Sequence, residues 1–312
     1  MSKIAIVQLP PVLLDRAATL ARSVDAVERA AREGAELIVF PETYVPGYPD
    51  WVWRAPPRDF ALASALHERL LANAVDLRAD DLAPLREAAR THGVTIACGI
   101  QERDGEFARS TLYNTVVVIG PDGAILNRHR KLVPTNPERM VWGMGDASGL
   151  RVVETPVGRL GALICWENYM PLARFALYAQ GIDVYLAPTW DEGDAWIASM
   201  RHIAREARAW VVSGAICMQA RDIPADFPGR SALYPDEDEW LNQGGAVVVD
   251  PTGAITLGPV RRERGIFIAE CDPARAAVAR RSLDVAGHYN RPDVFRLEID
   301  RTRRMPATFA DD

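Results

Sequence analysis

The sequence lacks the features that mark several common classes of protein. Its 312 residues include four cysteines, which lie far apart and form no C-x-x-C pair: Cys98, Cys165, Cys217 and Cys271. Such spacing favours reduced cytosolic thiols over a disulfide framework or a zinc site. No apolar run approaches the roughly 18 residues that span a membrane. The N-terminus "MSKIAIVQLPP" leads directly into a strand pattern and does not resemble a signal peptide. We therefore expect a cytoplasmic protein without a membrane segment.

Excess positive charge is also missing, as are the short motifs of several enzyme classes. The 36 basic residues are outnumbered by 42 acidic ones, and the net charge of −6 gives no electrostatic reason to expect nucleic acid. The five histidines show no metal-binding spacing. There is no G-x-S-x-G elbow, no phosphate-binding G-x-x-x-x-G-K-[ST] loop and no G-x-G-x-x-G fingerprint. These absences argue against the common serine hydrolases, nucleotide triphosphatases and dinucleotide enzymes, and no metal or cofactor is expected.

What the sequence does contain is an alternation of apolar strand patterns with amphipathic helical patterns. Helices are predicted from about Leu20 to Ala31, from about Asp80 to His92, and twice more among the later strands, whereas 221–242 is predicted to be a long surface loop. Strands or hairpins are predicted at 3–9, 35–40, 94–100, 113–131, 159–165, 183–188, 210–217, 245–258 and 265–271. No linker or repeat divides the chain. The pattern predicts one α/β domain, 1–312, whose sheets are covered by helices on their outer faces.

Three chemically reactive residues follow strand-like runs. Glu42 comes after "LIVFP", Lys131 after "ILNRHR", and Cys165 ends "LGALI". Strand ends on one edge of a sheet are where functional sites assemble in α/β proteins. A thiol with an ordinary pKa near about 8.5 is mostly protonated at neutral pH, so a carboxylate is needed to take its proton and an ammonium to stabilise the developing anion. Pro171 in the first turn of a following helix would also place Cys165 near a helix N-terminus, which favours a thiolate.

Ordinary structural roles compete with each of these assignments. A cysteine at the end of an apolar strand is more often a small buried hydrophobe than a nucleophile, and that interpretation is accepted for Cys98, Cys217 and Cys271. Four aromatic residues cluster after Glu42, and most are expected in the core or in a subunit interface: Tyr44, Tyr48, Trp51 and Trp53. The residues by themselves support a cysteine hydrolase only as a hypothesis.

Three longer segments resemble the carbon–nitrogen hydrolase (nitrilase) superfamily, and within it the nitrilase branch. "FPETYVPGYP" (40–49) is similar to its glutamate motif, "HRKLVPTNPERMVWGMGD" (129–146) to its lysine motif and "GALICWENYMPLAR" (161–174) to its cysteine motif. "GHYNRPDVF" (287–295) is similar to a segment typical of nitrilases. The order and spacing agree over nearly the whole chain, from about Lys3 to about Leu297, which leaves about 297–312 as a short C-terminal tail.

The resemblance implies a role for each matched residue. Glu42 would be the general base, Lys131 would stabilise the tetrahedral intermediate, and Cys165 would be the nucleophile. Glu138 would hold the lysine and assist proton handling, and the backbone N–H of Trp166 would contribute to the oxyanion site. Residues that resemble positions lining the substrate pocket are Tyr48, Asn114, Trp166 and Trp190.

The resemblance also implies a fold and an assembly. The expected fold is a four-layer αββα sandwich that dimerises by burying the helices after the Cys165 and Trp190 segments, which gives an αββααββα stack. The apolar face of the helix with Trp196 and Met200 suits such an interface. Many nitrilases have a longer C-terminal tail that helps to build spiral oligomers, whereas this chain stops soon after "RLEID". A homodimer is therefore expected, and long filaments are not.

The expected activity is that of a nitrilase, which converts a nitrile and two waters to a carboxylic acid and ammonia through a cysteine thioimidate and a thioester. An amidase or N-carbamoyl amidohydrolase would use the same four residues on an amide. From a different class, the chain could be a catalytically silent binding or assembly subunit on the same fold, although keeping Glu42, Lys131, Glu138 and Cys165 argues against that.

Overall fold

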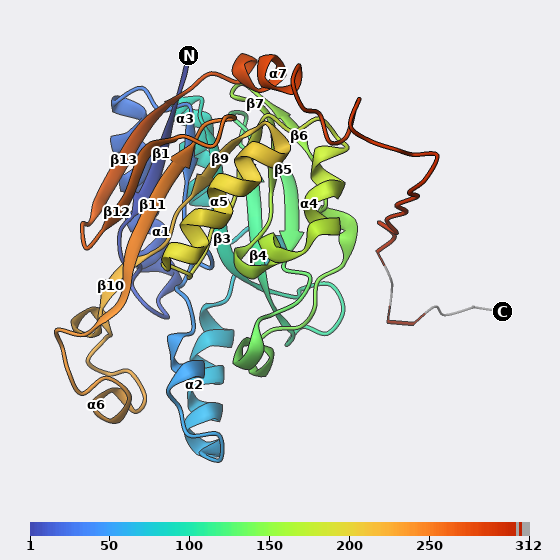
Figure 1. Cartoon of the computed structure of the whole chain (residues 1–312). Coiled ribbons are helices and arrows are strands. Elements are labelled where there is room, and N and C mark those ends of the chain that lie inside the picture. The colour runs from blue at the N-terminus through green and yellow to red at the C-terminus, as the bar shows by residue number, and fades with distance from the viewer. Residues whose placement is uncertain (304–305, 308–312) are drawn as a thin grey trace.

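Two β-sheets stacked face to face form the centre of the protein (Figure 1). The computed structural model describes residues 1–303 and 306–307. The strands of the first sheet run in the order β13–β1–β2–β3–β4–β5. Those of the second run in the order β10–β11–β9–β8–β7–β6, and β12 pairs with β11. Each sheet has a parallel centre and antiparallel edges, since β1, β2 and β3 are parallel in one and β7, β8 and β9 in the other.

The elements have the following bounds. The strands are β1 Ser2–Gln8, β2 Leu37–Val39, β3 Thr95–Arg103, β4 Leu112–Ile119, β5 Ile125–Arg130, β6 Val153–Thr155, β7 Gly158–Ala162, β8 Val184–Leu186, β9 Trp210–Ser213, β10 Cys217–Gln219, β11 Trp240–Val249, β12 Ile255–Arg261 and β13 Gly265–Cys271. The α-helices are α1 Arg16–Arg32, α2 Phe60–Asn73, α3 Ala83–His92, α4 Pro171–Tyr178, α5 Asp194–Ala207, α6 Arg230–Leu233 and α7 Ala274–Arg280. Short 3₁₀ helices include η1 Asp50–Trp53, η3 Asn136–Met140 and η5 Cys165–Tyr169.

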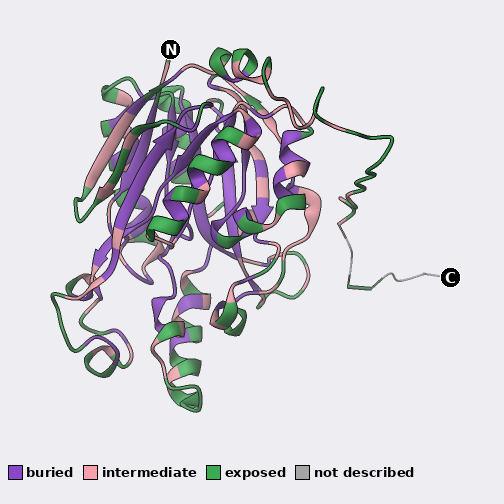
Figure 2. Ribbon diagram, viewed as in Figure 1, coloured by how far each residue is buried: buried purple, intermediate pink, exposed green. Residues whose placement is uncertain are grey.

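The alternation of side chains along the strands produces the layers. In β1, Ile4 and Ile6 face the second sheet, while Ala5 and Val7 pack with α1 and α3. In β9, Val212 faces the first sheet, while Val211 packs with α4 and α5. The result is the predicted four-layer αββα sandwich, with α1 and α3 outside one sheet and α4 and α5 outside the other. Figure 2 shows the consequence, since the strands are buried whereas α5 keeps an exposed outer face.

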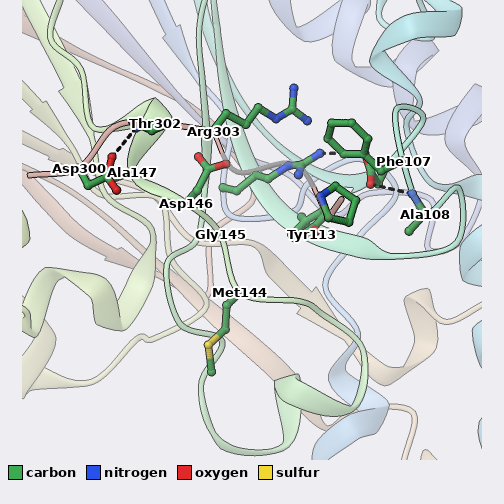
Figure 3. A pocket seen from close by; sticks show the side chains of 13 residues that line it. Phe107, Ala108, Tyr113, Met144, Gly145, Asp146, Ala147, Asp300, Thr302 and Arg303 are labelled. Carbon is green, nitrogen blue, oxygen red and sulfur yellow. Dashed lines mark hydrogen bonds and ion pairs between the residues drawn. The ribbon is translucent and has the colours of Figure 1, made fainter. Parts of the chain in front are cut away.

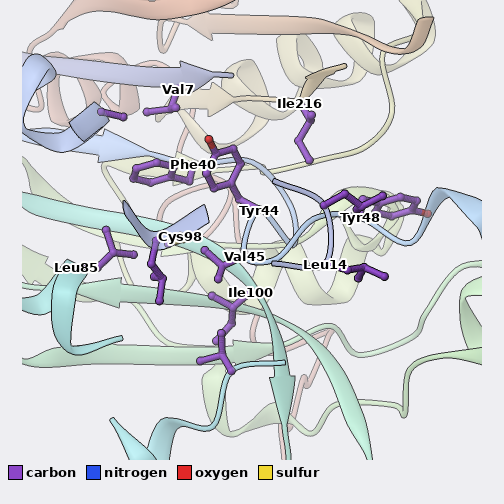
Figure 4. Packing of buried hydrophobic residues seen from close by; sticks show 14 of the residues in the cluster. Val7, Leu14, Phe40, Tyr44, Val45, Tyr48, Leu85, Cys98, Ile100 and Ile216 are labelled. Atoms are coloured by element: carbon purple, nitrogen blue, oxygen red, sulfur yellow. The ribbon is translucent and has the colours of Figure 1, made fainter. Parts of the chain in front are cut away.

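The turn after β2, which contains Glu42, is anchored in the core on both sides. Phe40 and Tyr44 are fully buried, and their ring centroids are 5.1 Å apart (Figure 4). The Val45 N–H then bonds to the Gly99 carbonyl of β3 at 3.1 Å. Gly99 is required there because a Cβ on it would overlap the Pro41 carbonyl oxygen and the Thr43 nitrogen. The backbone around Glu42 is therefore fixed by packing against β3.

Two sequence predictions of local structure were wrong, and one helix was missed. The strand predicted at 210–217 is two strands, β9 and β10, because the chain leaves the β9–β11 pairing at Gly214, which lies against Ile6 of the other sheet. The predicted surface loop 221–242 contains α6 and the start of β11, and it buries Phe227 and Tyr234 in the outer core. Helix α2 was not predicted, since among its residues only Leu66 and Leu70 are buried and its pattern is weakly amphipathic.

The predicted dimer face of α5 is occupied within the chain itself. Trp196 and Met200 are buried against the second sheet, and the Trp196 indole N–H donates to Ser213 Oγ at 3.0 Å. These two side chains are therefore not available to a second subunit. Exposed apolar side chains lie instead at Tyr169 and Leu172, next to and within α4.

Two further expectations concern the chain as a whole. Among the described residues, no helix is both long and apolar enough to cross a membrane. Of the predicted tail at 297–312, the part at residues 304–305 and 308–312 lies outside the described residues, and 297–303 contains no helix or strand.

The close approach at Gly99 gives a first prediction. We expect Gly99→Ala to lower the free energy of unfolding by about 3 kcal/mol, because the new methyl group overlaps backbone atoms that cannot move independently of β3. Gly93→Ala is the matched control: Gly93 has φ +62° with open space around it, so alanine there costs only the backbone strain of about 1 kcal/mol. Urea denaturation of both variants measures which of them loses more free energy of unfolding. Equal losses would mean that the turn around Glu42 adapts freely.

Candidate active site

Glu42, Lys131 and Glu138 form a buried ion-pair cluster. Lys131, directly after β5, places its Nζ 2.9 Å from Glu42 Oε1 and 2.8 Å from Glu138 Oε2. All three side chains are essentially inaccessible to solvent. Burial of a lone ammonium would be costly, but here the two carboxylates raise the pKa of Lys131 further above its ordinary value. The lysine is therefore charged, and one of its three N–H donors remains beyond these two ion pairs.

The two oxygens of Glu42 have different surroundings. Oε1 accepts from Lys131 Nζ and, at 2.7 Å, from Asn114 Nδ2. Oε2 is buried and has no hydrogen-bond partner among the described residues. Burial raises the pKa of Glu42, and this effect outweighs the opposing influence of Lys131. The structure therefore presents a carboxylate with one oxygen fixed and the other available to accept a proton.

Cys165 lies in a strained turn at the end of the neighbouring sheet. Its φ is +50°, a left-handed conformation that non-glycine residues seldom adopt. Its backbone N–H donates to Pro188 O at 2.9 Å, and its carbonyl accepts from Asn168 Nδ2 at 2.7 Å. Thr189 Oγ1 lies 3.4 Å from Sγ. Strained residues of this kind are kept in place only by such surrounding bonds, and they cluster at functional sites.

The environment of the thiol corrects the sequence interpretation. Strand β7 ends at Ala162, Cys165 begins the 3₁₀ turn η5, and α4 starts only at Pro171. The thiol is therefore not at the N-terminus of an α-helix. Burial raises the pKa of Cys165 to about 12, with Glu42 acting in the same direction and Lys131 opposing it. The resting thiol is protonated, so attack by sulfur requires a group that accepts its proton.

Glu138 is fixed by the loop that follows Lys131. It stands in the third position of η3, where its carboxylate accepts from the Thr135 backbone N–H at 2.6 Å in a capping box. The Tyr48 hydroxyl donates to its other oxygen at 2.6 Å. Glu138 thereby links Lys131 to the aromatic wall of the site.

A cavity of about 180 Å³ opens over Cys165 and Glu138. Its walls are Tyr48, Trp53, Thr135, Trp166, Trp190 and Asp191. Tyr48 and Trp190 stack with ring centroids 4.3 Å apart, and the Trp53 indole donates to the Tyr48 hydroxyl at 3.1 Å. The cavity is thus small, largely aromatic, and closed at its base by the thiol.

The predicted pocket residues fall into two groups. Tyr48, Trp166 and Trp190 line the cavity, and the Trp166 indole is held by Asp191 at 2.9 Å. Asn114 is instead fully enclosed behind Glu42 and is not among the cavity walls.

Sequence reasoning missed several residues of this site. Trp53, for which the core or an interface was preferred, lines the cavity, as do Thr135 and Asp191. Thr189 and Asp191 follow β8 in "APTWD", so the strand-end argument that found Cys165 could have found them too.

A larger cavity of about 520 Å³ lies elsewhere (Figure 3). It is bounded by Tyr113, Arg130, the turn at 144–147 and the C-terminal segment at Asp300–Arg303. None of Glu42, Lys131, Glu138 and Cys165 lines this larger cavity. Within the described residues, no group of three or more His, Cys, Asp and Glu side chains is arranged to hold a metal. The small cavity over Cys165 is therefore the candidate active site.

Comparisons with known proteins agree with this geometry. The carbon-nitrogen hydrolase family matches residues 3–281. An aliphatic nitrilase of Sinorhizobium fredii is 40% identical over 95% of this chain and 94% of its own length. Nitrilase 1 of Arabidopsis thaliana is 38% identical over 98% of this chain and 89% of its own length. The crystal structure of a carbon-nitrogen hydrolase from Helicobacter pylori superposes with a TM-score of 0.70 at 20% identity, covering 90% and 93% of the two chains, which shows the shared fold.

The high pKa of the thiol predicts how Cys165 reacts. We expect iodoacetamide to modify Cys165 faster than the other three cysteines, because Cys165 lines a cavity whereas Cys98, Cys217 and Cys271 line none of the described ones. Below a pKa of about 12 the thiolate fraction grows with pH, so the rate should rise about tenfold per pH unit between pH 7 and 9. Peptide mapping by mass spectrometry gives the rate at each cysteine. A rate independent of pH would contradict alkylation through a free thiolate in equilibrium with the protonated thiol.

Removal of the central cation should destabilise the fold in a pH-dependent way. Lys131→Met keeps the length of the side chain but leaves Glu42 and Glu138 without their buried partner, and we expect a loss of about 3–5 kcal/mol at pH 8. Burial gives Glu42 a higher pKa in the folded state than in the unfolded chain, so the folded variant binds a proton more readily and the loss should shrink towards pH 5. Urea titrations at several pH values measure this difference, and a loss independent of pH would argue against the ion-pair cluster.

Proposed function

The chain belongs to the carbon–nitrogen hydrolase family, a family of hydrolases that act on carbon–nitrogen bonds, and we propose that within it this enzyme is a nitrilase. The reaction takes a nitrile and two molecules of water to a carboxylic acid and ammonia. The observation on which this proposal rests is the joint placement of the Cys165 thiol, the Glu42–Lys131–Glu138 cluster and an aromatic cavity. The names of relatives at 37–40% identity over most of the chain support the nitrilase branch.

In the proposed first step, Cys165 Sγ attacks the nitrile carbon. The proton of the thiol passes by way of Glu42 to the nitrile nitrogen, which yields a covalent thioimidate. Glu42 Oε2 suits this role because it alone of the two oxygens has no other partner among the described residues. A nitrile is a weak electrophile, so transfer of the proton as the sulfur–carbon bond forms avoids the need for a free thiolate in a buried site.

In the following steps, water replaces nitrogen and then sulfur. Glu42 takes a proton from a water that adds to the thioimidate, and the tetrahedral intermediate is stabilised by the remaining N–H of Lys131 and by the backbone N–H of Trp166. Glu42 passes both protons of this water to the nitrogen in turn, so that ammonia leaves as the thioester carbonyl forms. A second water then hydrolyses the thioester to release the acid and restore the thiol. Glu138 keeps the Lys131 ammonium in place throughout.

The amidase or N-carbamoyl amidohydrolase alternative uses the same residues, and the names of the relatives favour the nitrilase branch over it. The silent-subunit alternative is disfavoured because the ion-pair cluster is intact and Cys165 faces a cavity. Since the family match covers residues 3–281, we propose a single hydrolase domain for the chain. Its four free cysteines agree with a reducing, cytoplasmic location.

We also propose that the enzyme is a homodimer whose interface includes α4, the helix after the Cys165 segment. Tyr169 and Leu172 are 42% and 66% exposed, and both are apolar groups on the outside of the second sheet, next to and within α4. An interface there would extend the sandwich into the αββααββα stack while leaving Trp196 and Met200 in the core of each subunit.

Ammonia release from a panel of nitriles and their matching amides tests the function. We expect nitriles to release ammonia at least about tenfold faster than the amides, and Cys165→Ala to lower the rate by at least about a thousandfold with the fold intact, because no other group in the cavity can form the covalent intermediate. Thermal unfolding of the variant provides the control for folding. Release mainly from amides would assign the enzyme to the amidase branch, and activity that survives in Cys165→Ala would refute the covalent mechanism.

A further inference from the structure

A second buried carboxylate, Glu167, lies directly behind the reacting groups. It follows Cys165 by two residues in η5, and its side chain is fully enclosed. Three N–H groups donate to it: the backbone of Leu132 at 2.6 Å, the backbone of Ile164 at 2.8 Å and His129 Nε2 at 3.0 Å. The proposed reaction assigns no role to this carboxylate, and it does not line the cavity over Cys165.

The two backbone donors are the chain neighbours of reacting residues. Leu132 directly follows Lys131, and Ile164 directly precedes Cys165. Oε1 accepts from Leu132 and Oε2 accepts from Ile164, so the two oxygens of one rigid carboxylate hold one backbone each. Lys131 extends from the first sheet and Cys165 from the second. Glu167 is therefore a direct bridge between the two sheets at the point where the ammonium and the thiol meet.

His129 completes the surroundings of this carboxylate. It lies on β5, two residues before Lys131, and is fully buried. An ionised carboxylate accepts hydrogen bonds only, which assigns the ring proton to Nε2. Nδ1 has no hydrogen-bond partner among the described residues. The Glu167 carboxylate is thus held by two backbone N–H groups and one side chain, and it is not exposed to solvent.

We propose that Glu167 is a positioning residue that sets the placement of the Lys131 ammonium relative to the Cys165 thiol. The inference rests on the nitrilase mechanism proposed above. Cys165 is in a left-handed conformation, so its turn depends on its surrounding bonds, and the bond at Ile164 is the one shared with the lysine loop. A displacement of about 1 Å between reacting groups can lower a rate by about a hundredfold.

Glu167→Gln is the discriminating variant. It keeps the size of the side chain but replaces one acceptor oxygen by an NH₂ donor, which must then face the N–H of either Leu132 or Ile164. Whichever way the amide is oriented, either the backbone at Leu132 or the backbone at Ile164 loses its hydrogen bond to residue 167. We expect kcat per folded molecule to fall about thirtyfold to three-hundredfold with KM for the nitrile within about threefold, because the cavity walls are untouched. The alkylation rate of Cys165 by iodoacetamide should fall at least about tenfold.

Asp250→Asn is the matched control. Asp250 is also a buried carboxylate that accepts two backbone N–H groups, from Thr252 at 2.8 Å and Ala254 at 3.2 Å, and that pairs with an arginine, Arg275. It lies at the turn between β11 and β12, away from both reacting loops. This variant should lose thermal stability while kcat and Cys165 alkylation stay within about threefold of the parent. A purely structural role for Glu167 predicts the same behaviour for Glu167→Gln.

The outcomes separate the two proposals. Folded Glu167→Gln with parental kcat and parental Cys165 alkylation would overturn the positioning role. If the parent hydrolyses no nitrile, the nitrilase proposal fails, but the alkylation comparison still decides the role of Glu167. If Glu167→Gln does not fold, the same measurements on Glu167→Asp decide, since the shorter carboxylate keeps its charge but cannot reach both loops. Loss of Cys165 alkylation in folded Glu167→Asp supports the proposal, and a parental rate refutes it.

Discussion

The ion pairs of Lys131 with Glu42 and Glu138 are the interaction on which the rest of the site depends. A buried ammonium is tolerated only where anionic partners surround it, and each of these two carboxylates in turn has a fixed position. Glu42 is held by Asn114 and by the packing of its turn on β3, whereas Glu138 is held by its own capping box and by Tyr48. The cluster joins the turn after β2 to the loop after β5, so its geometry belongs to the fold as a whole and is not set by one loop.

The second sheet carries Cys165, the proposed nucleophile, and this separation from the ion-pair cluster has a structural cost. Cys165 must reach the cluster from β7 across the space between the sheets, and it does so through a left-handed turn that the Asn168 and Pro188 bonds stabilise. Tyr185 then donates to Asn168 Oδ1 at 2.7 Å and extends this support to β8. The aromatic walls add to the enclosure, because Tyr48 is stacked on Trp190 and also bonded to Glu138. The polar groups around the cavity therefore bond largely to one another.

Much of the fold could be predicted from the sequence because buried parallel strands are continuous apolar runs, such as "AELIVF" and "VTIACGI". Helix α2 could not, since only Leu66 and Leu70 among its residues are buried. The candidate catalytic residues could be predicted because their motifs are long and in order. The direct hydrogen bond from Asn114 to Glu42 could not, because the two residues are far apart in the chain. The environment of the thiol was also beyond sequence reasoning. The pattern "CWENYMP" suggests a helix start. Whether a helix dipole or burial has the larger effect on the pKa of the thiol depends on where η5 ends and α4 begins.

Burial has opposite consequences for the resting enzyme and for the proposed reaction. It raises the pKa of both Cys165 and Glu42, so an isolated thiolate at Cys165 and an isolated carboxylate at Glu42 are each disfavoured. A neutral thiol is a weak nucleophile towards adventitious electrophiles and oxidants. When a nitrile occupies the cavity, formation of the sulfur–carbon bond disperses the charge that burial penalises, and a proton that leaves sulfur can be passed on to nitrogen instead of remaining on the carboxylate. The desolvation that suppresses the free thiolate therefore favours a concerted reaction, in which no isolated buried charge has to form. Lys131 then needs to stabilise only the negative charge that develops on nitrogen or oxygen.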